Sequence, residues 1–130
     1  MLLQKGLGVV GNSYYEASTR RPAAAAALTG AAEADVCVIG GGYAGVSAGL
    51  ELGGRGMSVA LLEAQRIGWG ASGRNGGQVI VGFGADGECA IENQFPPEEA
   101  RRAWGVSVQA VQLVRDRIAR HAIECHWRDG

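Results

Sequence analysis

Three glycines at fixed spacing are the residues of this chain best suited to hold an anionic ligand. Gly40, Gly42 and Gly45 fit the pattern G-x-G-x-x-G within the stretch GGGYAG. In this pattern the first glycine permits a tight turn out of a strand, the second lets a pyrophosphate approach the backbone, and the third lets a helix pack closely on the strand. Tyr43 and Ala44 would begin that helix, where N–H groups have no partner within the helix. The pattern predicts a site for the pyrophosphate of a dinucleotide.

An acidic residue follows this loop at a suitable distance. Glu63 comes 23 residues after Gly40, close to the ~20 expected for the carboxylate that binds a ribose in dinucleotide-binding units. A carboxylate accepts hydrogen bonds from a ribose diol and repels a 2′-phosphate, which disfavours NADP. The alternative is that the glycines only make a tight turn and that Glu63 is a solvated strand end.

A second glycine-rich stretch, residues 68–77, distinguishes between two dinucleotides. It reads GWGASGRNGG and holds five glycines in ten residues. An NAD-binding unit usually continues from its second strand into an ordinary helix, whereas this stretch offers backbone N–H groups, the Ser72 hydroxyl, the Arg74 guanidinium and the Asn75 amide. Such donors suit the longer FAD, along its pyrophosphate and ribityl portions. The alternative is a flexible surface loop.

The elements around these loops predict an α/β fold. The apolar run at 36–39 is typical of a strand buried on both faces, residues 43–54 indicate a helix, and residues 57–62 indicate a second buried strand. Together they form a Rossmann-like β-α-β unit whose strands should be parallel, joined by a right-handed crossover. Three glycines weaken the helix by roughly 1 kcal/mol each relative to alanine; they are Gly49, Gly53 and Gly54.

The second half of the chain predicts one long helix. Pro97 with the acids that follow it is typical of a helix start, and the apolar side chains then recur at helical spacing to about residue 121. These side chains are Trp104, Val108, Val111, Val114, Ile118 and Ala122. Residues 79–81 and 123–127 are expected to form short strands, and residues 1–34 an irregular lead-in with room for a short helix at 23–27. The sheet would remain incomplete.

Composition excludes several classes of protein. The chain has 130 residues, of which 47% are hydrophobic and 19% charged, so it can form a globular core. Its net charge of −1 gives no attraction for a nucleic acid. No apolar run approaches the ~20 residues that span a bilayer, so no membrane partner is expected.

The cysteines and a basic pair bear on the compartment. Three widely spaced cysteines without a CxxC pair favour a reducing, cytoplasmic environment. Arg20 and Arg21 precede an alanine-rich stretch that resembles a twin-arginine export signal, but Pro22 follows the pair directly and the stretch lacks leucine and phenylalanine of a signal core. We expect a cytoplasmic protein, with export as the alternative.

A third cluster bears on metal binding. His121, Cys125 and His126 lie close together, but no fourth ligand is evident, and a strand at 123–127 would point Cys125 and His126 to opposite faces. We therefore expect no metal site. Cys37, within the first strand, is expected to be buried by packing rather than reactive.

Three segments of this chain resemble the D-amino-acid-oxidase-like superfamily of FAD oxidoreductases. They read ADVCVIGGGYAGVSAGLEL, VALLEAQRIGWGASGRNGGQV and RRAWGVSVQAVQLVRDRIARHAIECHWRDG, and the early NSYYEAS adds to them. Within the superfamily they are most similar to γ-glutamylputrescine oxidase-like proteins. The likeness covers nearly the whole chain, and GWGASGRNGGQ is its most specific part. Members of this family are much longer, and they carry stronger helix formers in the first helix.

The resemblance implies which residues contact FAD. The three motif glycines would hold the pyrophosphate, Glu63 the adenosine ribose, and Arg66 would lie near the adenine; residues 72–77 would run toward the flavin. The candidate cofactor-binding residues are Gly40, Gly42, Tyr43, Ala44, Gly45, Glu63, Arg66, Ser72, Gly73, Arg74, Asn75, Gly76 and Gly77. The long helix and the strand at 123–127 would link the FAD-binding core to a substrate domain.

The resemblance also implies a reaction. Such enzymes oxidise the C–N bond of a small-molecule amine or amino acid to an imine and reduce O2. Residues 35–130 would be the N-terminal part of the FAD-binding domain, truncated and without the substrate domain, so no catalytic residue is expected here. The alternatives are a fragment of an NAD-binding dehydrogenase and a truncated product without function.

Overall fold

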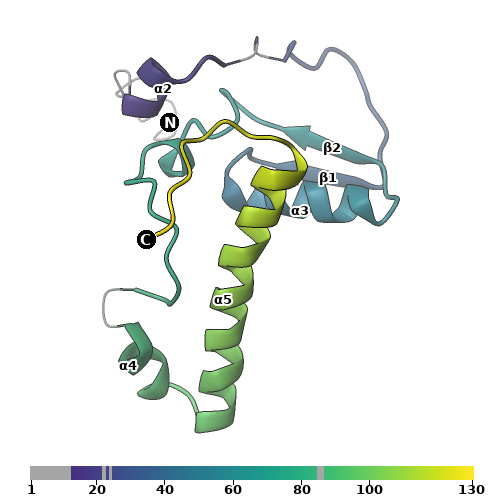
Figure 1. The fold of residues 1–130 in the computed structure, drawn as a ribbon. Helices are drawn as coiled ribbons and strands as arrows, with labels where there is room; N and C mark the ends of the chain where they lie inside the picture. The colour runs from purple at the N-terminus through teal and green to yellow at the C-terminus, as the bar shows by residue number, and fades with distance from the viewer. Residues whose placement is uncertain (1–12, 22, 24, 85–86) are drawn as a thin grey trace, which may run out of the picture. The chain divides into compact units, whose positions relative to one another are not determined.

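The computed structural model describes residues 13–21, 23, 25–84 and 87–130, and they divide into two compact units, Met1–Gly76 and Gly77–Gly130. The helices and strands follow one another as α2 (Tyr14–Ser18), β1 (Val36–Ile39), α3 (Tyr43–Gly54), β2 (Val59–Leu62), the 3₁₀ turn η1 (Ala71–Gly73), α4 (Gly87–Glu92) and α5 (Pro97–Arg120). Figure 1 shows them along the chain. The parts of the predicted lead-in at 1–12, 22 and 24 lie outside the described residues.

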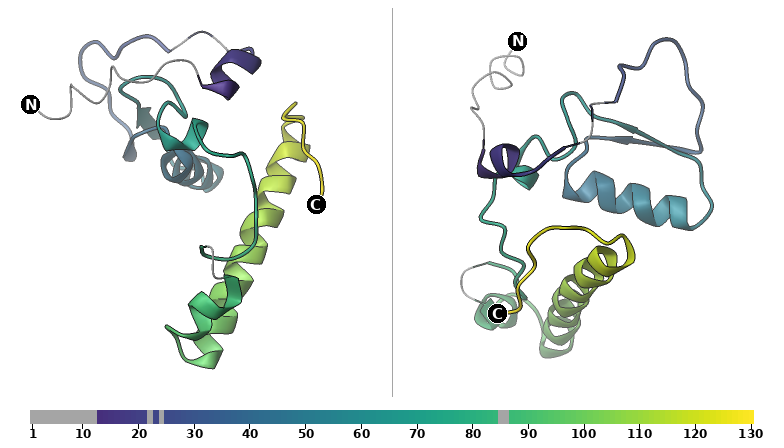
Figure 2. Two further views of the ribbon diagram at one scale, coloured as in Figure 1. Left: turned by 90° about the vertical axis from the view of Figure 1, so that its left-hand side faces the viewer. Right: turned by 45° about the horizontal axis from the view of Figure 1, so that its top comes forward.

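The first unit contains the predicted β-α-β unit. Strands β1 and β2 pair in parallel, with Val36 opposite Val59 and Ile39 opposite Leu62. Helix α3 connects them and lies along one face of the pair (Figure 2). The α/β fold class, the parallel pairing and the helix at 43–54 are therefore confirmed.

The expectation that β1 is buried on both faces is wrong. Val36 and Val38, on the face toward α3, are half-buried, whereas Cys37 is exposed and Ile39 is 86% exposed. Alternate side chains of a strand point to opposite faces, and among the described residues one helix covers one face only. Cys37 is accordingly not a packing residue of this unit.

A short helix in the lead-in was missed. Helix α2 begins after Ser13, whose side chain accepts a hydrogen bond from the Glu16 N–H at 3.2 Å. Serine at the cap position with glutamate three residues later is the signature of a capping box, and it is visible in the sequence. Residues 23 and 25–27 form no helix.

The second unit is built on two helices. Ile91 of α4 and Ala100 of α5 are each only 5% exposed and form the centre of this unit. Helix α5 runs from Pro97 to Arg120, close to the predicted 97–121. Acidic residues lie in its first turn, and Arg117 and Arg120 lie in its last. Ala122 lies beyond the helix at a φ of 47°, so it does not continue the apolar stripe.

Two predicted strands do not form. Residues 79–81 and 123–127 lie in extended or bent backbone without a strand partner in the described part of the chain. An apolar run becomes a strand only when a neighbour satisfies its backbone groups. The end of the chain is held instead by side chains: Asp129 pairs with Arg115, and Arg115 lies over the Trp127 ring at 5.5 Å.

Candidate cofactor site

The turn that leaves β1 requires glycine. Gly40 has a φ of 99°, in the left-handed region that L side chains rarely adopt. Its N–H donates to the Leu62 carbonyl at 2.7 Å, which extends the pairing of β1 and β2 by one residue. The first motif glycine therefore makes the tight turn predicted for it.

Gly45 leaves no room for a side chain. A Cβ added to it would lie 1.9 Å from the Gly40 carbonyl oxygen and 3.2 Å from a methyl of Val38. The first turn of α3 thus packs directly on the backbone that leaves β1, which is the close helix–strand contact predicted for the third motif glycine.

Gly42 is the N-cap residue of α3 and has no side chain to cap the helix. The cap comes from the second glycine-rich stretch, because the Tyr43 N–H donates to the Ser72 hydroxyl at 3.0 Å. A Cβ on Gly42 would lie 3.0 Å from the same oxygen. The structure therefore brings the two predicted loops together at the N-terminus of α3.

Several donors at this helix end stay open. Within the described part of the chain, the N–H groups of Gly42, Ala44 and Gly45 make no hydrogen bond. Unpaired N–H groups at the positive end of a helix dipole favour an anion. The backbone around Gly42 lacks the side chain that would fill this space, so a diphosphate fits the donors and the cradle.

Glu63 is anchored beside the loop. Its Oε2 accepts a hydrogen bond from the Gly41 N–H at 2.6 Å, and its Oε1 accepts one from the Gln65 N–H at 2.9 Å. These hydrogen bonds, the one from Gly41 first, hold the pKa of Glu63 below its ordinary value of 4.5. The side chain is thus an anionic acceptor at neutral pH, as binding a ribose diol requires.

Gly41 is a functional position that the sequence reasoning missed. A Cβ on it would lie 2.4 Å from Cδ1 of Ile67, and its carbonyl accepts a hydrogen bond from the Gly68 N–H at 2.8 Å. Gly41 thereby joins the first loop to the start of the second. Its signal in the sequence is that it is the middle one of three consecutive glycines, a position at which the motif does not require glycine.

A cleft of about 910 Å³ opens next to Glu63 in the first unit. Glu63 and Arg66 supply charge to its wall, and the ends of both strands supply apolar surface through Ile39 and Leu62. An apolar wall beside charged groups suits an adenosine, whose base is flat and apolar and whose ribose is polar.

The second loop is fixed by its own polar groups. Asn75 Nδ2 donates to the Tyr43 hydroxyl and to the carbonyls of Ala71 and Ser72, at 3.0, 3.1 and 3.0 Å. A Cβ on Gly73 would lie 2.3 Å from the Gly68 carbonyl oxygen, so this turn also requires glycine. Residues 68–75 therefore form a loop that hydrogen bonds tie to itself and to Tyr43 of α3.

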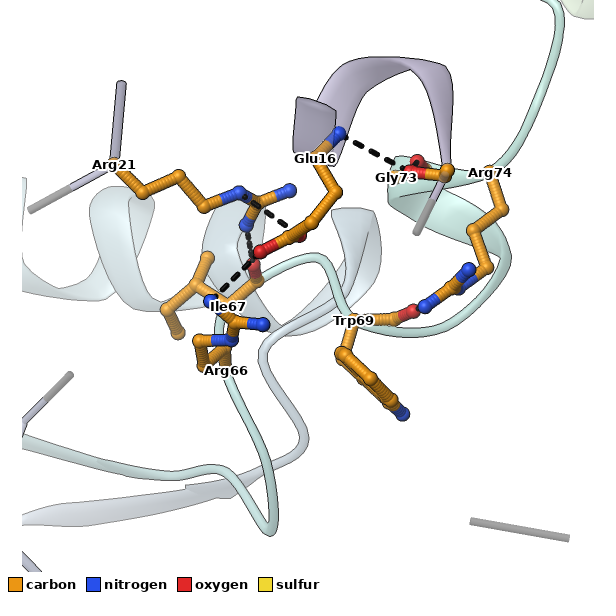
Figure 3. A network of polar contacts seen from close by, with 8 residues as sticks. Glu16, Arg21, Arg66, Ile67, Trp69, Gly73 and Arg74 are labelled. Carbon is orange, nitrogen blue, oxygen red and sulfur yellow. Dashed lines mark hydrogen bonds and ion pairs between the residues drawn. The ribbon is translucent and has the colours of Figure 1, made fainter. Parts of the chain in front are cut away.

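The two arginines of this region are engaged by neighbours. Arg74 Nε donates to the Trp69 carbonyl at 2.8 Å, and the Arg74 guanidinium lies over the Trp69 ring at 4.6 Å. Arg66 pairs with Glu16 at 2.7 Å (Figure 3). Trp69 contacts Arg74 through both its carbonyl and its ring and so anchors the loop. Gly76 and Gly77 follow, both exposed.

Two further observations concern metal sites and membrane-spanning helices. Within the described residues no group of three or more histidine, cysteine or acidic side chains could hold a metal ion. In the same part of the chain, no helix combines the length and apolar character needed to cross a bilayer.

The loop geometry, the open donors and the anchored carboxylate are those of a dinucleotide-binding unit, and sequence comparison defines the class. Residues 35–130 match the family described as FAD dependent oxidoreductase, and the chain belongs to this family. The family uses FAD, which decides the cofactor in favour of FAD over NAD.

Among individual relatives, the chain is 41% identical to gamma-glutamylputrescine oxidoreductase of Escherichia coli (strain K12), over 92% of this chain and 28% of that protein. It is also 41% identical to the probable oxidoreductase OrdL of Haemophilus influenzae, over 91% of this chain and 27% of that protein. The chain thus spans little more than a quarter of these relatives. No solved structure matches the chain significantly.

Proposed function

We propose that this chain forms the part of a FAD site that holds the diphosphate and the adenosine ribose. The open N–H groups of Gly42, Ala44 and Gly45, in a cradle without side chains, are the observation that supports it most strongly. The Ser72 hydroxyl accepts from Tyr43 and keeps its own proton for a phosphate oxygen. Glu63 accepts hydrogen bonds from the ribose hydroxyls.

The remaining candidates have supporting roles. Gly73 and Asn75 shape the turn that carries Ser72, and Gly76 and Gly77 lead the chain away from it, toward where the flavin would lie. Arg66 lines the cleft proposed for the adenosine. Arg74 supports the loop through its contacts with the Trp69 carbonyl and ring, and its guanidinium is not proposed to bind the cofactor directly. On this proposal residues 35–130 belong to one FAD-binding domain.

We further propose that the whole enzyme oxidises a small-molecule amine. When bound, FAD supplies the acceptor for two electrons from the substrate and passes them to O2. This chain contributes cofactor binding, and no residue of it is assigned to the substrate. The similarity to a protein named gamma-glutamylputrescine oxidoreductase supports an amine substrate. A cytoplasmic location stays a prediction from the cysteines.

An absorbance scan of the purified chain, before and after incubation with FAD and gel filtration, tests the cofactor proposal. We expect flavin bands to elute with the protein and a parallel sample with NAD to retain no nucleotide. A folded chain that retains NAD and not FAD would overturn the proposal. Oxygen uptake by the full-length enzyme, with a diamine compared with a 2-hydroxy acid, tests the substrate class.

A further inference from the structure

A carboxylate in the lead-in lies between two guanidinium groups. Glu16 Oε1 is 2.7 Å from Arg66 Nη1, and Oε2 is 3.3 Å from Arg21 Nε (Figure 3). The Glu16 side chain is only 13% exposed, whereas the partners of the helix-surface pair Arg55–Glu51 are 70% and 59% exposed. Shielding from solvent makes the Glu16 pairs stronger than ordinary surface pairs.

The same segment contacts the second loop at further points. Arg21 Nη1 donates to the Ile67 carbonyl at 2.8 Å, and the Ser13 hydroxyl donates to the Gly73 carbonyl at 3.4 Å. Arg21 Nε is buried and makes no hydrogen bond within the described residues, so Glu16 balances it by charge alone. Residues 13–21 therefore hold the loop at three successive places, at residues 66, 67 and 73.

These places flank the side chain that reaches α3. Ser72 lies next to Gly73, and its hydroxyl accepts the hydrogen bond from the Tyr43 N–H. A shift of the loop that reaches Gly73 would move this hydroxyl relative to the open donors of the helix. A contact that fixes the loop thus fixes the geometry of the diphosphate site.

We infer that Glu16 is a positioning residue for the cofactor loop: through Arg66 and Arg21 it holds residues 66–73 in the form that places Ser72 at the N-terminus of α3, and so it sets the affinity for FAD. The inference rests on the proposed function. Helix α2 lies before the residues that match the family, 35–130, so the family match assigns it no role.

Glu16→Gln tests this role because it keeps the shape of the side chain and removes its charge. Glu51→Gln is the matched control, since it breaks an ion pair of the same unit away from the loop. Two quantities are measured on the 130-residue chain: amide hydrogen exchange at residues 66–73 without FAD, and the Kd for FAD from flavin fluorescence. We expect Glu16→Gln to speed exchange and to raise the Kd about fivefold, and Glu51→Gln to change neither.

Arg66→Gln supplies a second test of the positioning role of Glu16. If Glu16 acts through Arg66, the effects of the two substitutions on FAD affinity are not additive in the double variant. Far-UV circular dichroism confirms that each variant is folded.

Exchange as slow as in the wild type in folded Glu16→Gln contradicts the positioning role, whether or not FAD binds. Faster exchange with an unchanged Kd also overturns it, because Glu16 would then stabilise the loop without serving the cofactor. A wild-type chain that takes up no FAD contradicts the proposed function instead.

Discussion

The amide of Gly41 donates a 2.6 Å hydrogen bond to Oε2 of Glu63, and this bond ties the glycine loop after β1 to the residue that follows β2. Two features that the sequence presents separately, a glycine motif and an acid 23 positions after Gly40, are thus one hydrogen-bonded structure. The bond orients the carboxylate, and the open N–H groups of α3 lie on the same loop. A nucleotide would meet donors for its phosphates and an acceptor for its ribose on one hydrogen-bonded frame.

The role of this carboxylate is tested by Glu63→Gln. The amide retains one oxygen acceptor, loses the negative charge and can no longer accept from both Gly41 and Gln65. We expect the Kd for FAD to rise about tenfold, as when a hydrogen bond to a charged group is lost. Isothermal titration of folded wild type and variant measures the change; equal affinities would show that Glu63 does not contact the ribose.

The stability of the first unit should depend on pH through the same group. Hydrogen bonds from Gly41 and Gln65 lower the pKa of Glu63 in the folded protein below its ordinary value of 4.5. Its stabilisation is therefore complete above that value and is lost as the pH falls through the lower, folded pKa. Urea titrations from neutral pH downward measure this loss.

Glu63→Gln should lose less stability on acidification than the wild type. Some pH dependence should remain in the variant, because Asp35, which accepts hydrogen bonds from Ser58, also has a lowered pKa. Identical pH profiles for the two proteins would contradict this role of Glu63.

Gly45→Ala tests the contact of helix and strand. The added methyl would lie 1.9 Å from the Gly40 carbonyl oxygen, so the start of α3 must shift. We expect a loss of about 1–3 kcal/mol in the free energy of unfolding, together with weaker FAD binding. Gly53→Ala is the control: a Cβ there meets nothing within 4 Å, and alanine should stabilise α3 by about 0.5–1 kcal/mol. Equal unfolding energies for both variants would rule out the close contact.

Ser72→Ala tests the cap that the second loop supplies. The Tyr43 N–H would lose its acceptor, and we expect α3 to lose about 1 kcal/mol of stability, as at other helix caps. Ser18→Ala, at the exposed end of α2, is a control of the same chemistry. Thermal unfolding followed at a helix wavelength measures both, and a Ser72→Ala variant as stable as the control would contradict the cap.

A separate test concerns the second unit, where Ser107 is only 7% exposed. Its hydroxyl accepts from the Gly82 N–H at 3.1 Å and donates to the Trp104 carbonyl at 2.8 Å. Ser107→Ala leaves the Gly82 N–H without an acceptor, and we expect a loss of about 1–3 kcal/mol. Gln109→Ala, on the exposed side of α5, should change the unfolding energy little in the same urea titration, and equal losses would refute the role of Ser107.

The sequence predicted the structure correctly where local backbone preferences and packing require the same residue. Gly40 and Gly45 predicted a turn and a close contact because no other residue fits either place, and Pro97 with its acids predicted the start of α5. Prediction failed where structure depends on distant partners. Residues 79–81 and 123–127 have the composition of strands but pair with no strand in the described part of the chain, and Cys37 is apolar but lies on the face that α3 does not cover.

The sequence predicted which residues of the candidate site lie close together better than it predicted what each side chain contacts. The glycines, Glu63 and Ser72 do lie together at one end of α3. The engagement of Arg66 by Glu16 was not foreseeable, because 50 residues separate the pair and no periodicity links them. The Ser13 cap with Glu16 three residues later was visible in the sequence, yet it was missed among residues of irregular composition.

The most direct test of the central claim is a ¹⁵N–¹H spectrum of the labelled chain recorded during titration with FAD. The claim is that the N-terminus of α3 holds the diphosphate. It predicts that the amide signals of Gly42, Ala44 and Gly45 shift the most, that ADP reproduces these shifts, and that the amides of α5 stay unchanged. Shifts confined to other residues, or shifts produced by NAD and not by FAD, would contradict the account.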